Sequence, residues 1–428
     1  MPDGAQMKVI ISNGFNKFHL SVAAASLARE GLLARFITGS YPTPLIRAVL
    51  SSPPLDKSDK LKKLLNRREA IPDELVTAFG WSELLPSIGL ALQRGAWSRS
   101  MANEMNRIGM RQYARACRNT IRSEAEAGAT IYHYRAGFGH ESVGIAKKAG
   151  MYALCDHSIV HPDLVDYLTT HHGQLPTEAQ TPKLSRFWRD ILADIEQADG
   201  VLVNSDFVRT TFEIQKWTQS PIFVTYLGVD QQFLDFATQA GTLRETPEAP
   251  EQKSLKILFA GGFDQRKGAY SVIDALSSLA DVDWTFKIAG ITHSDIKSEK
   301  ANFFADPRVQ QLGWISRSEL AREMSSADIF LFPSLAEGSA RVVFEALACG
   351  CYVITTPNSG SIVRDGEQGR LVPPGNTAEI ISALRSAANN RRLVSETGKQ
   401  NAKLIRQQYD QNAYGRKLAE IYRTVQES

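Results

Sequence analysis

Short runs of apolar, mostly branched residues alternate with segments of helical length along most of this chain. In the first half these runs cover residues 7–12, 130–134, 152–155, 201–204 and 222–226. A strand, a helix and a second strand form the repeating unit of a parallel sheet that helices cover on both faces. The alternation therefore predicts an α/β chain with Rossmann-like, doubly wound parallel sheets.

A second set of such runs indicates a second domain. It covers residues 255–260, 284–290, 329–333 and 352–355, and the polar stretch 239–254 separates it from the first set. A chain of 428 residues is also longer than one core comfortably supports. We expect an N-terminal domain of residues 1–228 with a variable, basic helical region at 41–125, a C-terminal domain of residues 229–409, and a last helix at 410–428 that crosses back.

The composition narrows the class of protein. Apolar residues make up 43% and charged residues 22% of the chain, which is typical of a globular fold. A net charge of +3 gives no global field for nucleic acid. The four cysteines lack metal-ligand spacing, which favours a reducing compartment. Without a signal pattern or a long apolar run, we expect a cytoplasmic protein whose membrane contact, if any, is peripheral.

The sharpest local pattern lies in residues 331–376. An apolar strand ends in a loop with Glu337 and Gly338, a helix opens near Ser339, and Glu345 lies about a turn and a half into it. A helix N-terminus at a sheet edge can bind a diphosphate, and a carboxylate can accept two hydrogen bonds from a ribose diol. Alone, two glutamates could equally be a helix cap and a solvated residue, but the flanking glycine and the PNSG loop favour the donor site.

With the neighbouring words EALACG, TPNSG and DGEQGRLVPPGN, this segment resembles the donor-binding motif of family-4 retaining glycosyltransferases with the GT-B fold. The resemblance is strong from about residue 256 onward and covers the first domain only in general plan. It implies two Rossmann-like domains across a cleft, with Glu337 on the donor sugar and Glu345 on the ribose. The same loop and first turn would bind the donor through Gly338, Ser339, Ala340, Arg341 and Val342.

A glycine loop at residues 259–268, FAGGFDQRKG, is the second signal. The family commonly places an arginine after the first glycine and a lysine before the last one, and both grip the donor diphosphate. Lys267 matches the lysine, whereas Gly262 replaces the arginine, so Arg266 is the candidate for the missing cation. Since no Asp-x-Asp pair stands at a strand end, we expect a metal-independent reaction without a cofactor. The resemblance implies that it is retaining.

Donor contacts in the first domain are expected in the loop after the first strand, at Asn13 and Gly14. The absence of a GxGxxG fingerprint argues against a dinucleotide site and hence against a dehydrogenase. The family often has a histidine near the transferred sugar, after a late strand of this domain. Both His157 and His161 follow the run 152–155, and the sequence does not choose between them.

Residues 134–142 follow another expected strand and provide acceptor-side candidates, namely Arg135, His140 and Glu141. Capping of the following helix is the alternative role for Glu141. A helix near residues 97–122 carries an apolar stripe and a basic stripe. The apolar stripe comprises Trp97, Met101, Met105 and Ile108, and the basic stripe comprises Arg107, Arg111, Arg115, Arg118 and Arg122. Together with the basic segment 55–69, this helix could rest on anionic lipid or simply pack in the domain.

These observations predict a glycosyltransferase that uses a nucleoside-diphosphate sugar, with UDP or GDP as the expected nucleotide. Its acceptor could be a glycan, a lipid-linked molecule or a small molecule, and nucleic acid is not an expected partner. Two alternatives stay open. A nucleotide-sugar epimerase or hydrolase would share the cleft, and a non-catalytic nucleotide-sugar-binding subunit would explain the lost arginine at Gly262. Nothing in the sequence indicates an oligomeric state.

Overall fold

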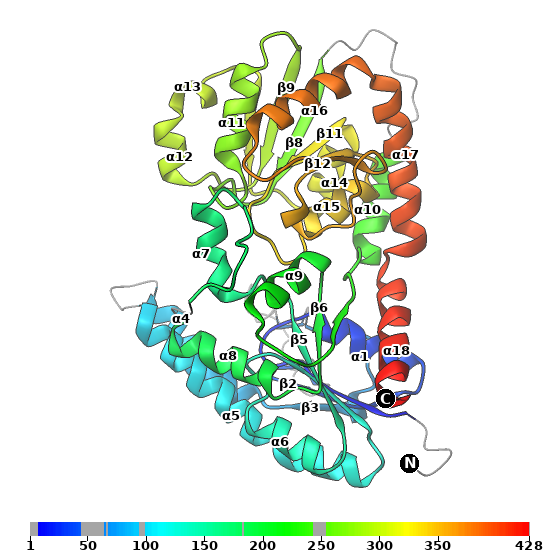
Figure 1. Ribbon diagram of the computed structural model, residues 1–428. Coiled ribbons are helices and arrows are strands. Elements are labelled where there is room, and N and C mark those ends of the chain that lie inside the picture. The colour runs from blue at the N-terminus through cyan, green and yellow to red at the C-terminus, as the bar shows by residue number, and fades with distance from the viewer. Residues whose placement is uncertain are drawn as a thin grey trace, which may run out of the picture.

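The computed structural model describes residues 7–43, 64–65, 67–93, 99–181, 184–242 and 254–427. Within these ranges the chain forms two α/β halves, each built around one sheet, with the first half at the bottom of Figure 1 and the second at the top. All strand pairs within the two sheets are parallel. The prediction of two doubly wound parallel sheets is therefore confirmed.

The first sheet has seven strands in the order β3-β2-β1-β4-β5-β6-β7. The strands are β1 (Val9–Ser12), β2 (Leu33–Thr38), β3 (Val76–Ala78), β4 (Ile131–Arg135), β5 (Tyr152–His157), β6 (Gly200–Val203) and β7 (Ile222–Val224). The helices of this half are α1 (Leu20–Arg29), α4 (Leu84–Gln93), α5 (Arg99–Glu126), α6 (Glu141–Lys148), α7 (Pro162–Thr170), α8 (Arg186–Glu196) and α9 (Asp206–Gln215). Alternate residues of a strand belong to two different apolar clusters, with Ile10 in the cluster on one face of the sheet and Ile11 in the cluster on the other. Both faces of the sheet are therefore covered.

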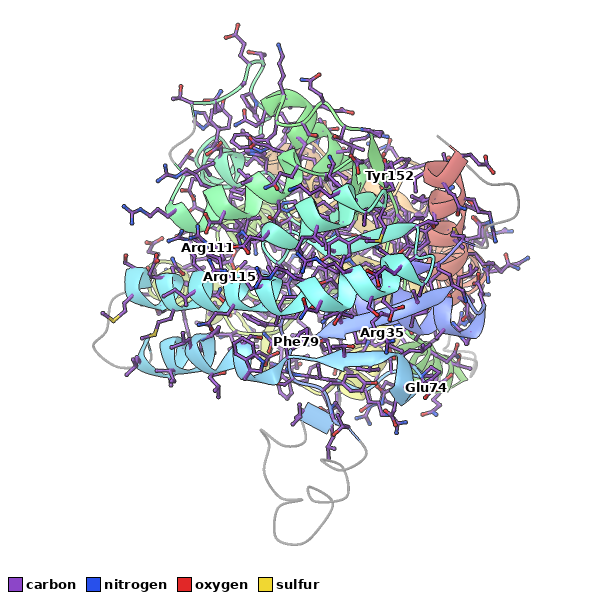
Figure 2. The ribbon with its side chains drawn as sticks, turned by 90° about the horizontal axis from the view of Figure 1, so that it is seen from below. Arg35, Glu74, Phe79, Arg111, Arg115 and Tyr152 are labelled. Carbon is purple, nitrogen blue, oxygen red and sulfur yellow. The ribbon has the colours of Figure 1, made fainter. Side chains whose placement is uncertain are left out.

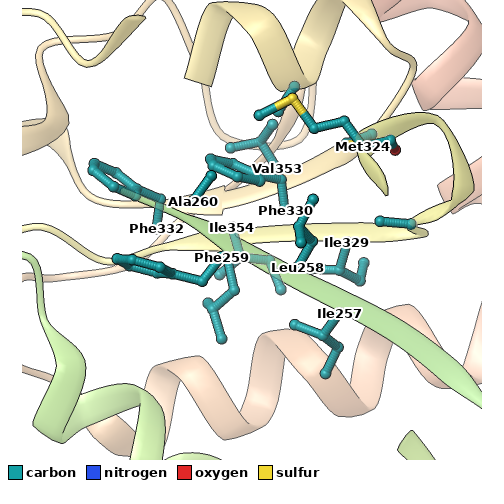
Figure 3. Close-up of a cluster of buried hydrophobic side chains, with 14 of the residues drawn as sticks. Ile257, Leu258, Phe259, Ala260, Met324, Ile329, Phe330, Phe332, Val353 and Ile354 are labelled. Atoms are coloured by element: carbon teal, nitrogen blue, oxygen red, sulfur yellow. Dashed lines mark hydrogen bonds between the residues drawn. The ribbon is translucent and has the colours of Figure 1, made fainter. Parts of the chain in front are cut away.

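The second sheet has six strands in the order β10-β9-β8-β11-β12-β13. The strands are β8 (Leu255–Ala260), β9 (Trp284–Ala289), β10 (Val309–Gly313), β11 (Ile329–Phe332), β12 (Tyr352–Thr355) and β13 (Gly369–Leu371). Around it lie α10 (Gln231–Thr242), α11 (Ala269–Ser278), α12 (Ser294–Glu299), α13 (Ala301–Phe304), α14 (Arg317–Ser326), α15 (Arg341–Ala348) and α16 (Thr377–Asn389). Its central strands are continuous apolar runs, and the rings of Phe259 and Phe332 stack with centroids 5.4 Å apart (Figure 3). This core holds β8 and β11 side by side.

The last two helices connect the halves. After α17 (Arg391–Gln408), α18 (Gln411–Glu427) descends along the first half and packs against α1 (Figure 1). Tyr422 of α18 reaches through to the sheet, where its hydroxyl lies 2.7 Å from His133 Nδ1. The two segments that cross between the halves meet where Val229 pairs with Asp410. None of the helices in the described ranges combines the length and apolar character needed to cross a bilayer.

The buried face of α5 is not the face that carries the apolar stripe described in the sequence analysis. Met110, Tyr113, Cys117 and Ile121 are the residues that pack under the sheet. Met101 and Ile108 are exposed instead, because this end of α5 extends beyond the sheet and lies beside α4. The alternative that these two residues pack in the core is therefore wrong. Trp97 and most of the basic segment 55–69 lie outside the described residues.

Candidate active site

The glycine loop after β8 places a lysine at the carboxyl end of the second sheet. Asp264 closes this loop, since its Oδ1 accepts the Lys267 backbone N–H at 3.0 Å. The Lys267 side chain then turns back toward Gly261, where a Cβ atom would lie only 3.0 Å from Nζ. Gly261 has a φ of +117°, which also favours glycine. The positive φ of Gly261 and its lack of a side chain leave room for the Lys267 ammonium at the strand end.

Glu337 lies on the neighbouring loop, after β11, and meets this lysine. Its Oε1 is 2.7 Å from Arg266 Nη1 and 3.7 Å from Lys267 Nζ. Arg266 also donates to the carbonyl of Ala336 at 2.6 Å, so the guanidinium spans the backbone and the carboxylate. The two loops are further joined by the hydrogen bond from Leu335 N to the Arg266 carbonyl. The structure thus brings Glu337, Arg266 and Lys267 together, as the sequence predicts.

Glu345 lies in a separate ionic cluster at the start of three helices. It is buried on α15, and its Oε1 accepts from Arg317 Nη2 at 3.1 Å. Arg317, at the start of α14, also makes two hydrogen bonds to Asp230, and Arg341 reaches the same carboxylate at 3.2 Å. Burial raises the pKa of Glu345 even though Arg341 and Arg317 oppose the shift. Burial acts on Asp230 in the same direction, but the hydrogen bonds from Arg317 hold its pKa below the usual value.

This cluster faces a cavity between the halves. The cavity has a volume of about 520 Å³ and is lined by the loop after β1, the crossing segment and the first turns of α14 and α15. Its charged lining includes Lys17, Glu69, Asp230, Arg317 and Arg341, whereas Glu345 of the cluster is not among the lining residues. Helix α15 begins at Arg341, and no side chain caps its first turn within the described residues. An anionic ligand would meet cations and open helix amides here.

The loop after β11, which carries Glu337 and Gly338, rests on the first half. Ser205 Oγ donates to the Gly338 carbonyl, and a Cβ atom on Gly338 would lie 2.1 Å from the Ser158 carbonyl oxygen. Asn358 Nδ2 donates to the Gly173 carbonyl at 2.6 Å. Gly338 is therefore required for close contact between the halves. The close approach of the Ser158 backbone is sufficient to explain why residue 338 is a glycine, without a bound ligand.

A comparison with protein families agrees with this geometry. Residues 254–390 match the family model described as glycosyl transferases group 1. The matched part, which is less than half of the chain, is similar to that family. The matched region contains the glycine loop, Glu337 and Glu345, which are the residues that carried the resemblance in the sequence.

Curated relatives extend the comparison beyond the matched region. Phosphatidyl-myo-inositol mannosyltransferase of Mycobacterium leprae is 27% identical over 207 residues, 46% of this chain and 55% of the relative. Alpha-D-kanosaminyltransferase of Streptomyces kanamyceticus is 27% identical over 327 residues, 72% of this chain and 80% of the relative. The chain spans about half the length of the first curated relatives it matches.

Two solved structures share the fold over nearly the whole chain. Sucrose-phosphate synthase from Thermosynechococcus elongatus has a TM-score of 0.62 at 16% identity and covers 98% of this chain and 99% of its own. Anabaena HepE, solved in complex with UDP, has a TM-score of 0.58 at 15% identity and covers 98% of this chain and 100% of its own. The fold of the chain is therefore GT-B, as the resemblance implied.

In the N-terminal half, the loop after β1 turns its first residues inward. The Gly14 N–H donates to the Tyr113 hydroxyl at 3.2 Å, and Asn13 Nδ2 donates to the Asn16 carbonyl at 2.9 Å. The part of this loop that lines the cavity comes later and includes Lys17 and His19. Sequence reasoning chose the glycine of this loop and missed the residues that reach the cavity.

His19 belongs to a polar network that reaches the cavity and was also missed. Its Nε2 lies 2.8 Å from Asp156 Oδ2, and Ser158 Oγ donates to Asp156 Oδ1 at 3.0 Å. Burial would raise the pKa of Asp156, but His19 and the nearby His133 ring hold it well below the usual value. No local sequence pattern links His19 to Asp156, because the pair forms only when β1 and β5 are placed in one sheet.

The two histidine candidates, His157 and His161, are both buried near Phe212. Their ring centroids lie 5.0 and 4.9 Å from that of Phe212, and their Nε2 atoms have no partner within the described residues. His161 also caps α7, because its Nδ1 accepts from Asp163 N at 3.3 Å. Between the two histidines, Ser158 and Ile159 contact Gly338. The segment thus meets the loop after β11 through its backbone.

Acidification should destabilise the protein through these histidines. Burial lowers the pKa of His157 to about 4 and that of His161 to about 3. Both are neutral in the folded state and gain a proton on unfolding below pH 6.5, so stability is lost as the pH falls. For His161 the loss between pH 6.5 and 5 is about 2 kcal/mol. Urea unfolding of His161→Asn, which keeps a capping oxygen, should show a correspondingly smaller loss than wild type, and an equal loss would mean that His161 is not the group responsible.

The acceptor-side candidates separate in the structure. Arg135 contacts the loop after β1, with Nη1 3.2 Å from the Phe15 carbonyl and its guanidinium 4.1 Å from the Phe18 ring centroid. Burial lowers the Arg135 pKa to about 10. The His140 N–H instead donates to Asp194 at 2.6 Å, which fixes a turn. Glu141 is exposed and pairs with Arg115 and Arg118 of α5. Of the three candidates, only Arg135 therefore contacts the loop that lines the cavity.

Proposed function

We propose that the protein transfers a sugar from a nucleoside-diphosphate sugar to an acceptor hydroxyl. The observation that carries this proposal is the meeting of Glu337, Arg266 and Lys267 at the carboxyl ends of β8 and β11. The family match over residues 254–390 supports the same activity. In this proposal Glu337 contacts the donor sugar, Lys267 contacts the diphosphate, and Arg266 is a positioning residue that holds the Glu337 carboxylate.

The chemical step follows from the placement of charge. The bond between the anomeric carbon and the diphosphate oxygen breaks while a bond to the acceptor oxygen forms on the same face, which retains the configuration. The acceptor proton passes to an oxygen of the leaving diphosphate. Lys267 and the first turn of α15 stabilise the negative charge that develops on that group, so the step needs no metal ion.

The nucleotide would occupy the cavity beside the ionic cluster. Glu345 is placed to accept hydrogen bonds from the ribose once Arg317 shifts toward the diphosphate. Arg317 and Arg341 provide two cations near the site and offset the arginine that Gly262 replaces, which Arg266 cannot do while it binds Glu337. Because the Anabaena structure is solved with UDP, UDP is the first nucleotide to test and GDP the second.

The acceptor would bind on the side of the first half. Arg135 lies behind the loop after β1, and the backbone of Ser158 and Ile159 borders the loop after β11. A hydroxyl of a glycan, of a lipid-linked molecule or of a small molecule meets the chemical requirement. We propose that the closed cleft excludes water, since water would compete with this hydroxyl.

Ligand-induced stabilisation tests the donor site directly. A nucleoside diphosphate at one hundred times its dissociation constant should raise the free energy of unfolding by about 2.7 kcal/mol. Thermal unfolding with UDP, GDP, ADP and the corresponding sugar nucleotides measures this rise. Glu345→Ala should strongly reduce this stabilisation by the nucleotide. The control Glu396→Ala, at an exposed position on α17, should leave the stabilisation unchanged. A panel in which no nucleotide stabilises the chain would refute the proposal.

Product analysis separates transfer from the alternatives. An epimerase or hydrolase turns over the donor alone, whereas a transferase requires an acceptor for efficient turnover. We expect slow release of the nucleoside diphosphate from the donor alone and a large acceleration by the correct acceptor. Fast epimerisation without an acceptor would favour the first alternative. Binding without any turnover across an acceptor panel would favour the non-catalytic subunit.

A further inference from the structure

The surface formed by α4 and the first half of α5 is unusually apolar for an exposed surface. Helix α4 has the sequence LLPSIGLALQ and contains no charged residue. We call the exposed apolar side chains of this surface the apolar ridge. Its members are Trp81, Leu84, Ile88, Leu90, Met101 and Ile108. Leu84 is 63% exposed and Leu90 57% exposed. Isolated exposed leucines are ordinary, but four large exposed apolar side chains within residues 81–90, in a segment packed against α5, indicate a contact surface.

The ridge is fixed in position by close packing of its two helices. A Cβ atom on Gly109 of α5 would lie 2.6 Å from Pro86 of α4, and one on Gly89 would lie 3.2 Å from Met105. Both glycines therefore bring the helix axes closer than larger residues would allow. Because α4 is held against α5 in this way, its outer side chains are presented to solvent in one orientation.

A row of arginines borders the ridge along α5. Figure 2 shows the helix crossing this face of the molecule, with Arg111 and Arg115 on it. Asp190 is shared by Arg107 and Arg111, and Glu141 is shared by Arg115 and Arg118. Each of these acids thus faces two arginines, and within the described ranges Glu104 is the one further acid paired with the row. Arg122 continues the row and makes no ion pair with a described residue, so the row keeps a positive charge.

We propose that the apolar ridge and the arginine row dock the protein on a bilayer that contains anionic phospholipid. The leucine, isoleucine and methionine side chains would enter the boundary between headgroups and acyl chains, and Trp81 would lie at the headgroup level. The exposed arginines of the row, Arg111, Arg115, Arg118 and Arg122, would face the lipid phosphates, whereas Arg107 is buried. A phosphate-bearing surface fits both halves of the patch, since it offers negative charge directly above an apolar layer.

This docking goes beyond the proposed sugar transfer and does not depend on it. The ridge residues contribute nothing to the cavity that faces Arg317 and Arg341. Vesicle binding can therefore be measured without donor or acceptor. If the chain does not bind vesicles, the proposed sugar transfer is unaffected. If no sugar transfer is detected, the proposed docking is unaffected.

Co-sedimentation with lipid vesicles tests the proposal. The full chain should bind vesicles of phosphatidylcholine and phosphatidylglycerol at least about tenfold more tightly than vesicles of phosphatidylcholine alone, and added salt should weaken the binding. The double variant Leu84→Ser and Ile88→Ser should bind at least about tenfold more weakly, because it removes the inserted side chains. Both positions are exposed, so circular dichroism should show an unchanged fold.

Further variants separate insertion of the ridge from attraction by charge and from a general effect of surface substitution. Leu393→Ser, at an exposed position on α17, should bind vesicles like wild type. Arg111→Gln with Arg115→Gln should weaken binding to anionic vesicles by about fivefold per arginine and leave the weak neutral binding unchanged. The proposal would be overturned if the Leu84 and Ile88 double variant bound vesicles as tightly as wild type. It would also be overturned if the wild-type chain did not bind vesicles but associated with itself, and the double variant did not self-associate. That result would assign the ridge to contact with a second copy of the chain.

Discussion

Replacing Lys267 by alanine should lower kcat/KM for release of the nucleoside diphosphate by about 100- to 1000-fold, which is the range expected when one stabiliser of developing charge is lost. The lysine ammonium lies 3.7 Å from Glu337 Oε1 and 5.5 Å from the Phe332 ring centroid, at a position largely shielded from water. In such surroundings a positive charge beside the leaving diphosphate stabilises it far more than it would in water. Steady-state assays with the donor that stabilises the fold measure this loss.

A matched lysine separates this loss from a general effect of charge. Lys297 is exposed on α12 of the same half and makes no ion pair with a described residue, so Lys297→Ala removes the same charge far from the two loops. That variant should keep kcat/KM within about twofold of wild type, as expected for a surface change. A Lys267→Ala enzyme as active as this control would remove Lys267 from the catalytic site.

The meeting of Glu337 with Lys267 could be predicted because it depends on topology alone. The two residues lie far apart in sequence, but each follows a strand, and β8 and β11 are neighbours in the sheet. Carboxyl ends of adjacent parallel strands share one edge, so loop residues there come together. The family resemblance selected the two residues, and the strand pattern placed each of them in a loop after a strand.

The ionic cluster around Arg317 could not be predicted in the same way. Asp230 belongs to the segment that crosses between the halves, and Arg317 begins a helix behind a serine cap. Their contact arises because the N-termini of three helices lie close together in the fold. The spacing of residues in the sequence does not predict this arrangement. His19 and Asp156 are a similar case, because their partnership needs two strands of the first sheet in place.

Helix α5 shows where a sequence pattern misleads. The spacing of Met101, Met105 and Ile108 is helical, and the helix forms as expected. Periodicity identifies an apolar side of a helix but does not say what covers it. Here the sheet covers the helix only from about Met110 onward, on another side. Met101 and Ile108 of the earlier turns are therefore exposed, whereas Met105 packs against α4.

Replacing Gly268 by alanine should destabilise the fold by about 2 to 4 kcal/mol, because the change combines backbone strain with a clash. Gly268 has a φ of +80°, and a Cβ atom there would lie 2.2 Å from the carbonyl oxygen of Pro333. That carbonyl belongs to backbone in the loop that leads to Glu337, so it can move away only if the two loops separate. The urea unfolding midpoint should fall accordingly.

Gly366→Ala isolates the contribution of the contact. Gly366 has the same φ of +80°, but no described atom lies within 4 Å of the position of its Cβ. Its alanine variant should therefore lose only about 1 kcal/mol, from strain alone. Separation of the loops should also lengthen the distance between Lys267 and Glu337, so Gly268→Ala should lose activity that Gly366→Ala retains. Equal losses of stability in the two variants would mean that close contact between the loops does not hold the site together.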